Sequence, residues 1–126
     1  PYNQRQYCTN YHLLETIAAY DSPSLRGKTG LRPIDGQRSL WCSKVHAEGA
    51  LTEMLSKAQA RYCFLSYNSE GLLQKDQILE VMARYGQADC VERDISRFRA
   101  DVDRKNRVYK ADRVTEYLFR LRRMAL

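Results

Sequence analysis

The spacing of hydrophobic positions changes between residues 61 and 86, and this change predicts a strand followed by a helix. The run from Tyr62 to Leu65 is apolar at consecutive positions, which favours an interior parallel strand over one with a solvated face. From Lys75 onward the apolar residues recur at helical spacing, and Gly86 is expected as the C′ residue of that helix. The apolar face of this predicted helix consists of Ile78, Leu79, Met82 and Tyr85.

Two helices and a long loop are predicted before this strand. Thr9 or Asn10 can cap a first helix, and Ser22-Pro23 ends it. Residues 22–40 hold two prolines and three glycines without a sustained period, so we expect an irregular loop. The second helix is expected over residues 43–60. The predicted apolar stripes are Leu13, Leu14, Ile17 and Ala18 in the first helix, and Ala47, Leu51, Met54, Leu55 and Ala58 in the second.

The sequence pattern in the C-terminal third of the chain predicts two more strands. Residues 88–98 alternate loosely between apolar and polar positions, and residues 114–121 are rich in β-branched and aromatic side chains. A helix is the competing interpretation of residues 114–121. We favour a strand, because residues 99–112 would then close an antiparallel hairpin at the edge of the sheet. The whole pattern indicates an α/β fold containing half of a βαβ unit.

The composition is that of a single soluble domain. The chain has 126 residues, of which 44% are hydrophobic and 29% charged, enough for one modest core. We expect a cytoplasmic protein without membrane contact, because no apolar run is as long as a membrane span and the first residues do not resemble a secretion signal. Cys8, Cys42, Cys63 and Cys90 lie far apart, so we expect buried free thiols and no metal site.

The formal net charge of +6 is concentrated in two stretches. The first contains Asp35 as its only acidic residue, and the second lies between residues 93 and 110. Both stretches could face a polyanion such as nucleic acid, and a solvated basic surface is the open alternative. The cations of the first stretch are Arg26, Lys28, Arg32, Arg38 and Lys44.

Several blocks of sequence together resemble the adenine-N6 DNA methyltransferases of bacterial restriction-modification systems. Pro1-Tyr2-Asn3 with Arg5-Gln6-Tyr7 resembles the end of the DPPY signature and its RQY extension. Further similar blocks follow in the same order, namely NYHLLETIA at 10–18, GKTGLR at 27–32, FLSYNSEG at 64–71, RFRAD at 97–101 and TEYL at 115–118. The co-occurrence of these blocks in one order is far more specific than any single block.

The resemblance implies a fold and a place in a larger enzyme. The Asp and first Pro of the signature would lie just before Pro1, and the glycine-rich cofactor motif and the target-recognition segment would lie further upstream. Residues 1–126 therefore resemble the C-terminal half of the methyltransferase domain. They are expected to form a partial Rossmann-like sheet with helices on both faces and a C-terminal antiparallel hairpin.

The resemblance also implies the chemistry. The enzyme would transfer a methyl group from S-adenosylmethionine to adenine N6 in double-stranded DNA, and the target base must be flipped out of the duplex to be reached. Pro1 and Tyr2 would be the catalytic residues, with Tyr2 stacking on the flipped base. The other expected site residues are Asn3, Tyr7, Tyr67 and Asn68 in the adenine pocket, and Arg5, Arg26, Lys28, Arg32 and Arg38 on DNA.

Other interpretations remain open at this stage. Tyr7 could be ordinary packing, and turn chemistry alone would select Asn and Ser after the strand at 62–65. The chain could be a non-catalytic DNA-binding remnant, or a helper that pairs with a separate cofactor-binding chain. Because S-adenosylmethionine would be bound mainly by the missing N-terminal half, we expect residues 1–126 alone to be inactive.

Overall fold

The computed structural model describes residues 3–96 and 113–124. Pro1 and Tyr2, and the predicted hairpin connection at 99–112, lie outside these ranges. The described chain forms helices and strands in the order α1 (Tyr7–Asn10), α2 (His12–Ala19), the 3-10 helix η1 (Leu40–Cys42), α3 (Ala47–Lys57), β1 (Tyr62–Asn68), α4 (Lys75–Ala83), β2 (Gly86–Ser96) and β3 (Arg113–Arg123).

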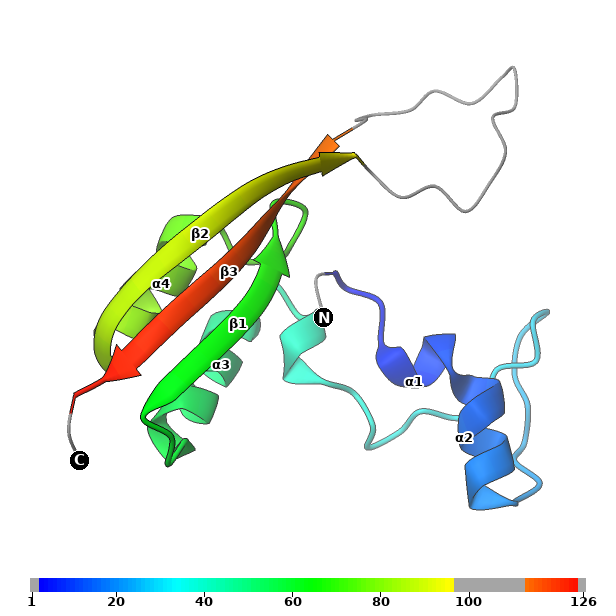
Figure 1. Cartoon of the computed structure of the whole chain (residues 1–126). Coiled ribbons are helices and arrows are strands. Elements are labelled where there is room, and N and C mark those ends of the chain that lie inside the picture. The colour runs from blue at the N-terminus through cyan, green and yellow to red at the C-terminus, as the bar shows by residue number, and fades with distance from the viewer. Residues whose placement is uncertain (1–2, 97–112, 125–126) are drawn as a thin grey trace.

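The three strands form an antiparallel sheet in the order β1-β3-β2 (Figure 1). β3 is the central strand, with Leu65 opposite Phe119 on one side and Cys90 opposite Phe119 on the other. The predictions of two C-terminal strands and of their antiparallel pairing are confirmed. One detail of the prediction is wrong. β1 was expected as an interior parallel strand, but it is an edge strand of the described sheet and its partner β3 runs antiparallel to it.

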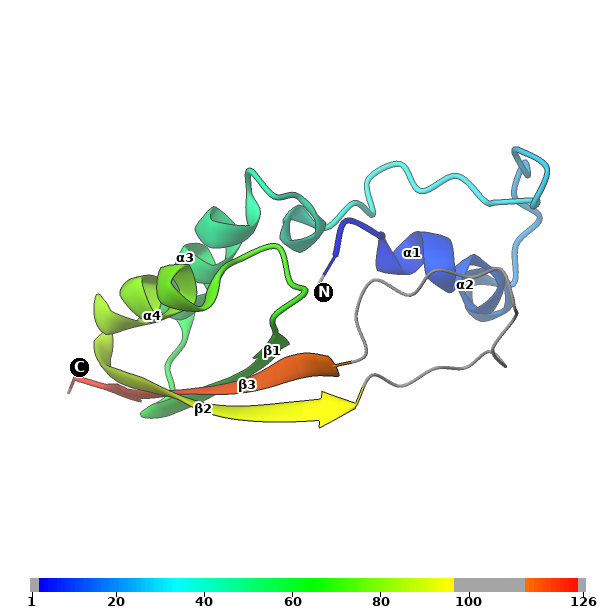
Figure 2. The same ribbon diagram turned by 90° about the horizontal axis from the view of Figure 1, so that it is seen from above.

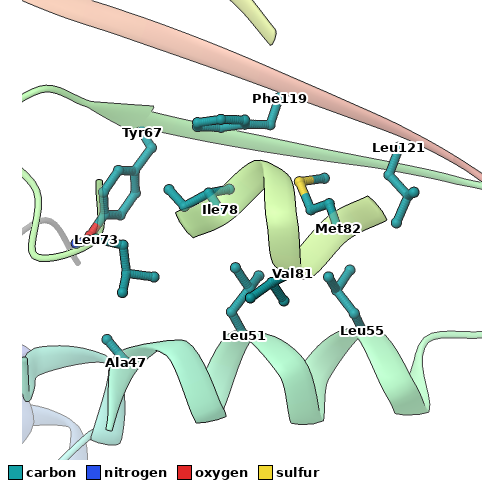
Figure 3. Packing of buried hydrophobic residues seen from close by; sticks show 10 residues of the cluster. All are labelled: Ala47, Leu51, Leu55, Tyr67, Leu73, Ile78, Val81, Met82, Phe119 and Leu121. Carbon is teal, nitrogen blue, oxygen red and sulfur yellow. The ribbon is translucent and has the colours of Figure 1, made fainter. Parts of the chain in front are cut away.

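Helices α3 and α4 pack together on one face of the sheet and enclose the core (Figures 2 and 3). The core forms because apolar residues at helical spacing in α3 and α4 meet alternate residues of β1 and β3. Phe119 is completely buried between the strands and the helices. The buried cluster is Ala47, Leu51, Leu55, Tyr67, Leu73, Ile78, Val81, Met82, Phe119 and Leu121.

The opposite face of the sheet is left open by the described residues. Phe64 is 67% exposed, and Tyr62, Val91 and Leu118 are also exposed. The consecutive apolar residues of β1 therefore point alternately into the core and into solvent, as in any strand. Helices on both faces were expected, but the described helices cover only one face.

The two central helices occur where the sequence predicts them, with differences at their ends. α3 begins four residues later than expected, and Met54 is exposed although it was assigned to the buried stripe. Gly86 is the first residue of β2 and not the C′ residue of α4. Its lack of a side chain is required by the sheet, because a Cβ atom there would lie 2.2 Å from the carbonyl oxygen of Arg122.

Helices α1 and α2 lie to one side of the sheet and its two helices (Figure 1). No residue of α2 is buried, and Leu13, Leu14 and Ile17 of the predicted apolar side of this helix are exposed among the described residues. The expected irregular loop follows. Its main regular feature is a short β-bridge between Arg26 and Leu31.

All four cysteines are free thiols. Cys8 and Cys42 are buried as expected, whereas Cys63 and Cys90 are only partly buried. Within residues 3–96 and 113–124, no group of three or more His, Cys, Asp or Glu side chains could hold a metal ion. No helix in these ranges has the length and apolar character needed to cross a membrane.

Candidate functional site

A pocket of about 470 Å³ lies where the N-terminal segment meets α3 and β1. This volume is in the range of small-molecule sites. Its lining in the described part of the chain combines aromatic and apolar side chains with amides, the Ser66 hydroxyl and one cation, and includes no carboxylate. The lining residues are Asn3, Arg5, Tyr7, Asn10, Trp41, Met54, Leu65, Ser66 and Tyr67.

The N-terminal segment contributes polar groups to this pocket in a defined geometry. The Asn3 side chain accepts a hydrogen bond from the backbone N–H of Arg5 at 2.8 Å, which closes a tight turn. The exposed Arg5 guanidinium has no hydrogen bond or ion pair within the described ranges. Because a guanidinium keeps its charge and offers several N–H donors, Arg5 is suited to bind an anion such as a phosphate.

Tyr7 presents an aromatic ring at the same pocket. Its ring lies 4.6 Å from that of Tyr11, centroid to centroid, with 31° between the planes. A hydrogen bond with the Tyr11 side chain raises the pKa of Tyr7 above its ordinary value of 10.0. Tyr7 is therefore neutral at physiological pH. Its ring can stack on a ligand.

Trp41 and Met54 line the pocket, although neither was predicted as a site residue. Trp41 belongs to η1. The Ser39 hydroxyl caps this 3-10 helix by accepting a hydrogen bond from the backbone N–H of Trp41 at 3.3 Å. A signal existed in the sequence, because Trp41 is the chain's one tryptophan and follows directly after the long loop. Met54 was placed in the core by helical spacing, but it lies at the edge of the α3 stripe.

The end of β1 places only part of its predicted site residues at the pocket. Tyr67 lines it, but its side chain is 3% exposed, and its hydroxyl accepts hydrogen bonds from the backbone N–H groups of Leu72 and Leu73. Asn68 is not among the lining residues. Its side chain accepts from the N–H of Glu70 at 3.1 Å and closes the turn after β1. The hydrogen bond that closes this turn is therefore a structural reason for an asparagine at position 68.

Comparison with known proteins assigns the family. The family model of the D12 class N6 adenine-specific DNA methyltransferase matches residues 1–85. The chain belongs to this family. Among curated relatives, the type II methyltransferase M.NlaIII of Neisseria lactamica is 45% identical over 118 residues, which cover 94% of this chain and 34% of that relative. M.FokI of Planomicrobium okeanokoites is 49% identical over 86 residues, which cover 68% of this chain and 13% of that protein.

A third relative, M.CviAII of Paramecium bursaria Chlorella virus 1, is 34% identical over 94% of this chain and 34% of its own length. The chain thus spans about a third, or less, of the length of these type II methyltransferases. The resemblance inferred from the sequence blocks is confirmed. No solved structure matches the chain significantly.

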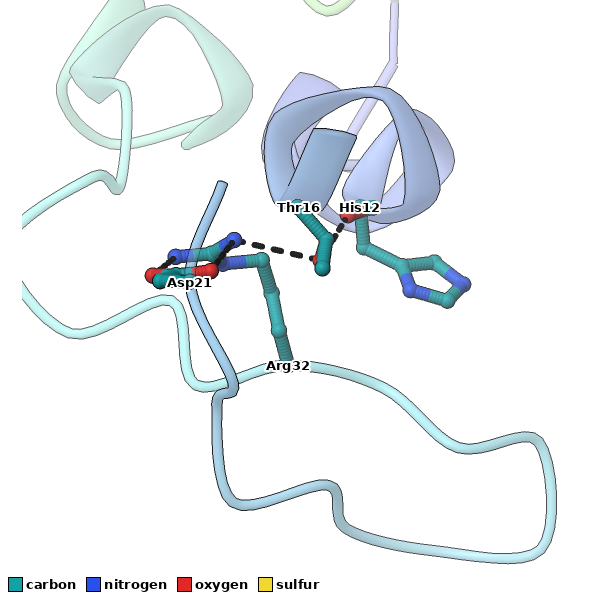
Figure 4. Close-up of polar contacts among 4 residues, drawn as sticks. All are labelled: His12, Thr16, Asp21 and Arg32. Carbon is teal, nitrogen blue, oxygen red and sulfur yellow. Dashed lines mark hydrogen bonds and ion pairs between the residues drawn. The ribbon is translucent and has the colours of Figure 1, made fainter. Parts of the chain in front are cut away.

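The loop of this D12 class chain holds its predicted DNA-binding cations in two different environments. Arg32 donates to both carboxylate oxygens of Asp21, at 2.8 and 3.1 Å, and to the Thr16 hydroxyl at 3.1 Å (Figure 4). The Arg32 side chain is 12% exposed, so it ties the loop to the end of α2. Arg26, Lys28 and Arg38 are exposed. The bridge between residues 26 and 31 places Lys28 near the tip of a short turn.

Proposed function

We propose that the parent protein transfers a methyl group from S-adenosylmethionine to N6 of adenine at a specific site in double-stranded DNA. In this proposal, residues 1–126 supply much of the pocket that holds the flipped adenine. The family match over residues 1–85 is the observation that carries the proposal. The lining of the pocket supports it, because a flipped base is held by aromatic faces and by hydrogen bonds to its edge.

Individual side chains of the pocket are suited to stacking on a base and to hydrogen bonding with its edge. Tyr7 and Trp41 offer aromatic faces, and Asn3 and Asn10 offer amides with both donors and acceptors. Tyr2, by resemblance, stacks on the base, and the carbonyl of Pro1 is a candidate acceptor for the exocyclic amine. Tyr67 and Asn68 remain predicted pocket residues, although the hydrogen bonds of both side chains fit a structural role better.

The methyl donor fits this pocket less well than the base does. S-adenosylmethionine carries a sulfonium and an amino group and supplies the electrophilic methyl group when bound. Such a cation is favoured by nearby carboxylates, and no carboxylate belongs to the residues lining the pocket in the described part of the chain. We therefore propose that the cofactor is held mainly by the part of the parent protein outside this chain.

The same reasoning extends to the fold and to DNA. We propose that the sheet is one edge of a Rossmann-like methyltransferase sheet, in which the rest of the parent covers the exposed face around Phe64. Exposed apolar patches of this kind mark interaction surfaces. We propose further that Arg5, Arg26, Lys28 and Arg38 contact phosphates, and that the enzyme acts in the cytoplasm where bacterial DNA lies.

The experiment incubates the parent protein with duplex DNA and labelled S-adenosylmethionine and identifies the modified nucleoside by mass spectrometry. N6-methyladenine from the parent, and no methylated product from residues 1–126 alone, is the expected result. Binding of DNA without any methylation would contradict the proposal and favour a non-catalytic DNA-binding protein. Methylation of cytosine would contradict the assignment of adenine.

A further inference from the structure

The pocket has two walls that come from different parts of the chain. One wall belongs to the segment that follows Pro1 and Tyr2 and includes Asn3, Arg5 and Tyr7. The other wall belongs to η1, α3 and β1 and includes Trp41 and Leu65. The distance between the walls determines whether a flat base fits between them. The contacts that join the two walls therefore control the geometry of the site.

Gln6 makes the most complete of these contacts. Its side-chain Nε2 donates to the carbonyl oxygen of Ser39 at 3.3 Å, and its Oε1 accepts from the backbone N–H of Ser39 at 2.8 Å. The amide thus exchanges both hydrogen bonds with one backbone residue, as two paired residues do in an antiparallel sheet. Both bonds are partly buried, so breaking them would leave polar groups with little access to water.

The neighbouring contacts between the same two segments are weaker. The Cys42 thiol donates to the carbonyl oxygen of Arg5 at 3.3 Å, and the Cys8 thiol donates to that of Gln37 at 3.7 Å. A thiol is a poor hydrogen-bond donor. Gln6 is therefore the principal polar link between the wall that follows Tyr2 and the wall that contains Trp41.

We propose that Gln6 is a positioning residue that fixes the segment of Asn3 to Tyr7 against η1, and so sets the geometry of the adenine pocket. This inference rests on the proposed function. Gln6 lies outside the pocket lining and touches no reacting group in this account. Its effect reaches the reaction because a displacement of about 1 Å in a positioning group can reduce a rate about 100-fold.

The test uses the complete parent enzyme with Gln6→Leu, which keeps the bulk of the side chain and removes both hydrogen bonds. The single-turnover methylation rate should fall about 10- to 100-fold. The dissociation constant for duplex DNA should change little, because ground-state affinity rests mainly on phosphate contacts. A parent-like rate in Gln6→Leu would overturn the proposal, as would an equal loss of rate and of DNA affinity.

A matched control separates this role from general effects. Gln4→Leu makes the same change at an exposed glutamine that has no side-chain hydrogen bond in the described ranges. Gln4→Leu should methylate close to the parent rate. A loss in Gln4→Leu as large as that in Gln6→Leu would overturn the specific role of Gln6.

Gln6→Glu covers the case in which Gln6→Leu fails to fold. An ionised Glu keeps the acceptor for the Ser39 N–H but cannot donate to the Ser39 carbonyl, whereas a protonated Glu can do both. The rate of Gln6→Glu relative to the parent, measured at each pH, should therefore rise as the pH falls toward the Glu pKa of about 4.3 or somewhat above. A flat ratio would overturn the proposal. An inactive parent would instead overturn the proposed function.

Discussion

The ring of Tyr67 lies directly against Gly71, so that a Cβ atom at position 71 would be 2.0 Å from the Cε1 atom of the ring. The chain after β1 folds over the ring, and the N–H groups of Leu72 and Leu73 reach its hydroxyl at 2.9 and 3.2 Å. This arrangement joins the end of β1 to the start of α4. It also holds one side of the pocket in place.

Gly71→Ala should destabilise the protein by about 2 kcal/mol or more, because the added methyl group must displace a buried ring. Gly49→Ala is the matched control. Gly49 lies within α3 and nothing lies within 4 Å of a Cβ atom there, so alanine should stabilise the helix by about 0.5–1 kcal/mol. Urea denaturation of the three proteins measures both effects. Equal stability of the two variants would contradict the packing described for Tyr67.

The ion pair between Asp89 and Arg120 predicts an acid-sensitive contact between β2 and β3. Arg120 donates to both carboxylate oxygens of Asp89, at 2.6 and 2.9 Å, and this hydrogen bonding lowers the pKa of Asp89 below its ordinary 3.8. A carboxylate with a lowered folded-state pKa stabilises the fold above its unfolded-state pKa, and this contribution is lost as the pH falls through the folded-state value.

The unfolding free energy should therefore decrease below about pH 4, and Asp89→Asn should make that decrease smaller. Arg120→Gln should have the same effect, because either variant removes the pair. Both side chains are exposed, so 1 M salt should also reduce the difference in unfolding free energy between the unchanged protein and these variants. Denaturation at a series of pH values checks this prediction. An unchanged pH profile in Asp89→Asn would show that the pair does not form in solution.

The loop cations should separate into two groups when each is changed to glutamine in the parent protein. Loss of Arg26, Lys28 or Arg38 should flatten the dependence of log affinity on log salt by about 0.9 for each phosphate contact removed, with little change in stability. Arg32→Gln should instead lower stability by about 1 kcal/mol or more, because it breaks the hydrogen bonds to Asp21. DNA titrations at several salt concentrations, with thermal melts, measure both quantities. An unchanged slope in the first three variants would remove the loop from the DNA interface.

Much of the secondary structure could be predicted because it is encoded in local periodicity. The helices at Leu51 and Ile78 follow from spacings that repeat over several residues. The strand at Phe119 was favoured by its β-branched and aromatic residues, which are a local signal as well. The pairing of the strands could not be predicted from local periodicity. Whether β1 is central or at an edge, and which way its partner runs, depends on contacts far apart in sequence. A short apolar run such as Tyr62 to Leu65 is compatible with either arrangement.

The candidate site was predicted only in part for the same reason. Asn3, Arg5 and Tyr7 were found because their order in the chain carries the family resemblance. Trp41 reaches the pocket only through the folded path of the loop, which leaves no periodic signal in the sequence. Arg32 and Lys28 are equally basic in sequence, and only the structure separates the cation paired with Asp21 from the exposed one.

The central claim is that residues of this chain hold the adenine after it has left the duplex. Single-turnover methylation by the parent enzyme, measured beside equilibrium DNA binding for Tyr2→Ala and Tyr2→Phe, tests it most directly. Tyr2→Ala should lower the methylation rate about 5- to 150-fold, because stacking on a base is worth about 1–3 kcal/mol and is made only with the extruded base. Its affinity for unmodified duplex should change little, and Tyr2→Phe should stay close to the parent in both measurements because it keeps the ring. Methylation by Tyr2→Ala at the parent rate would contradict the claim.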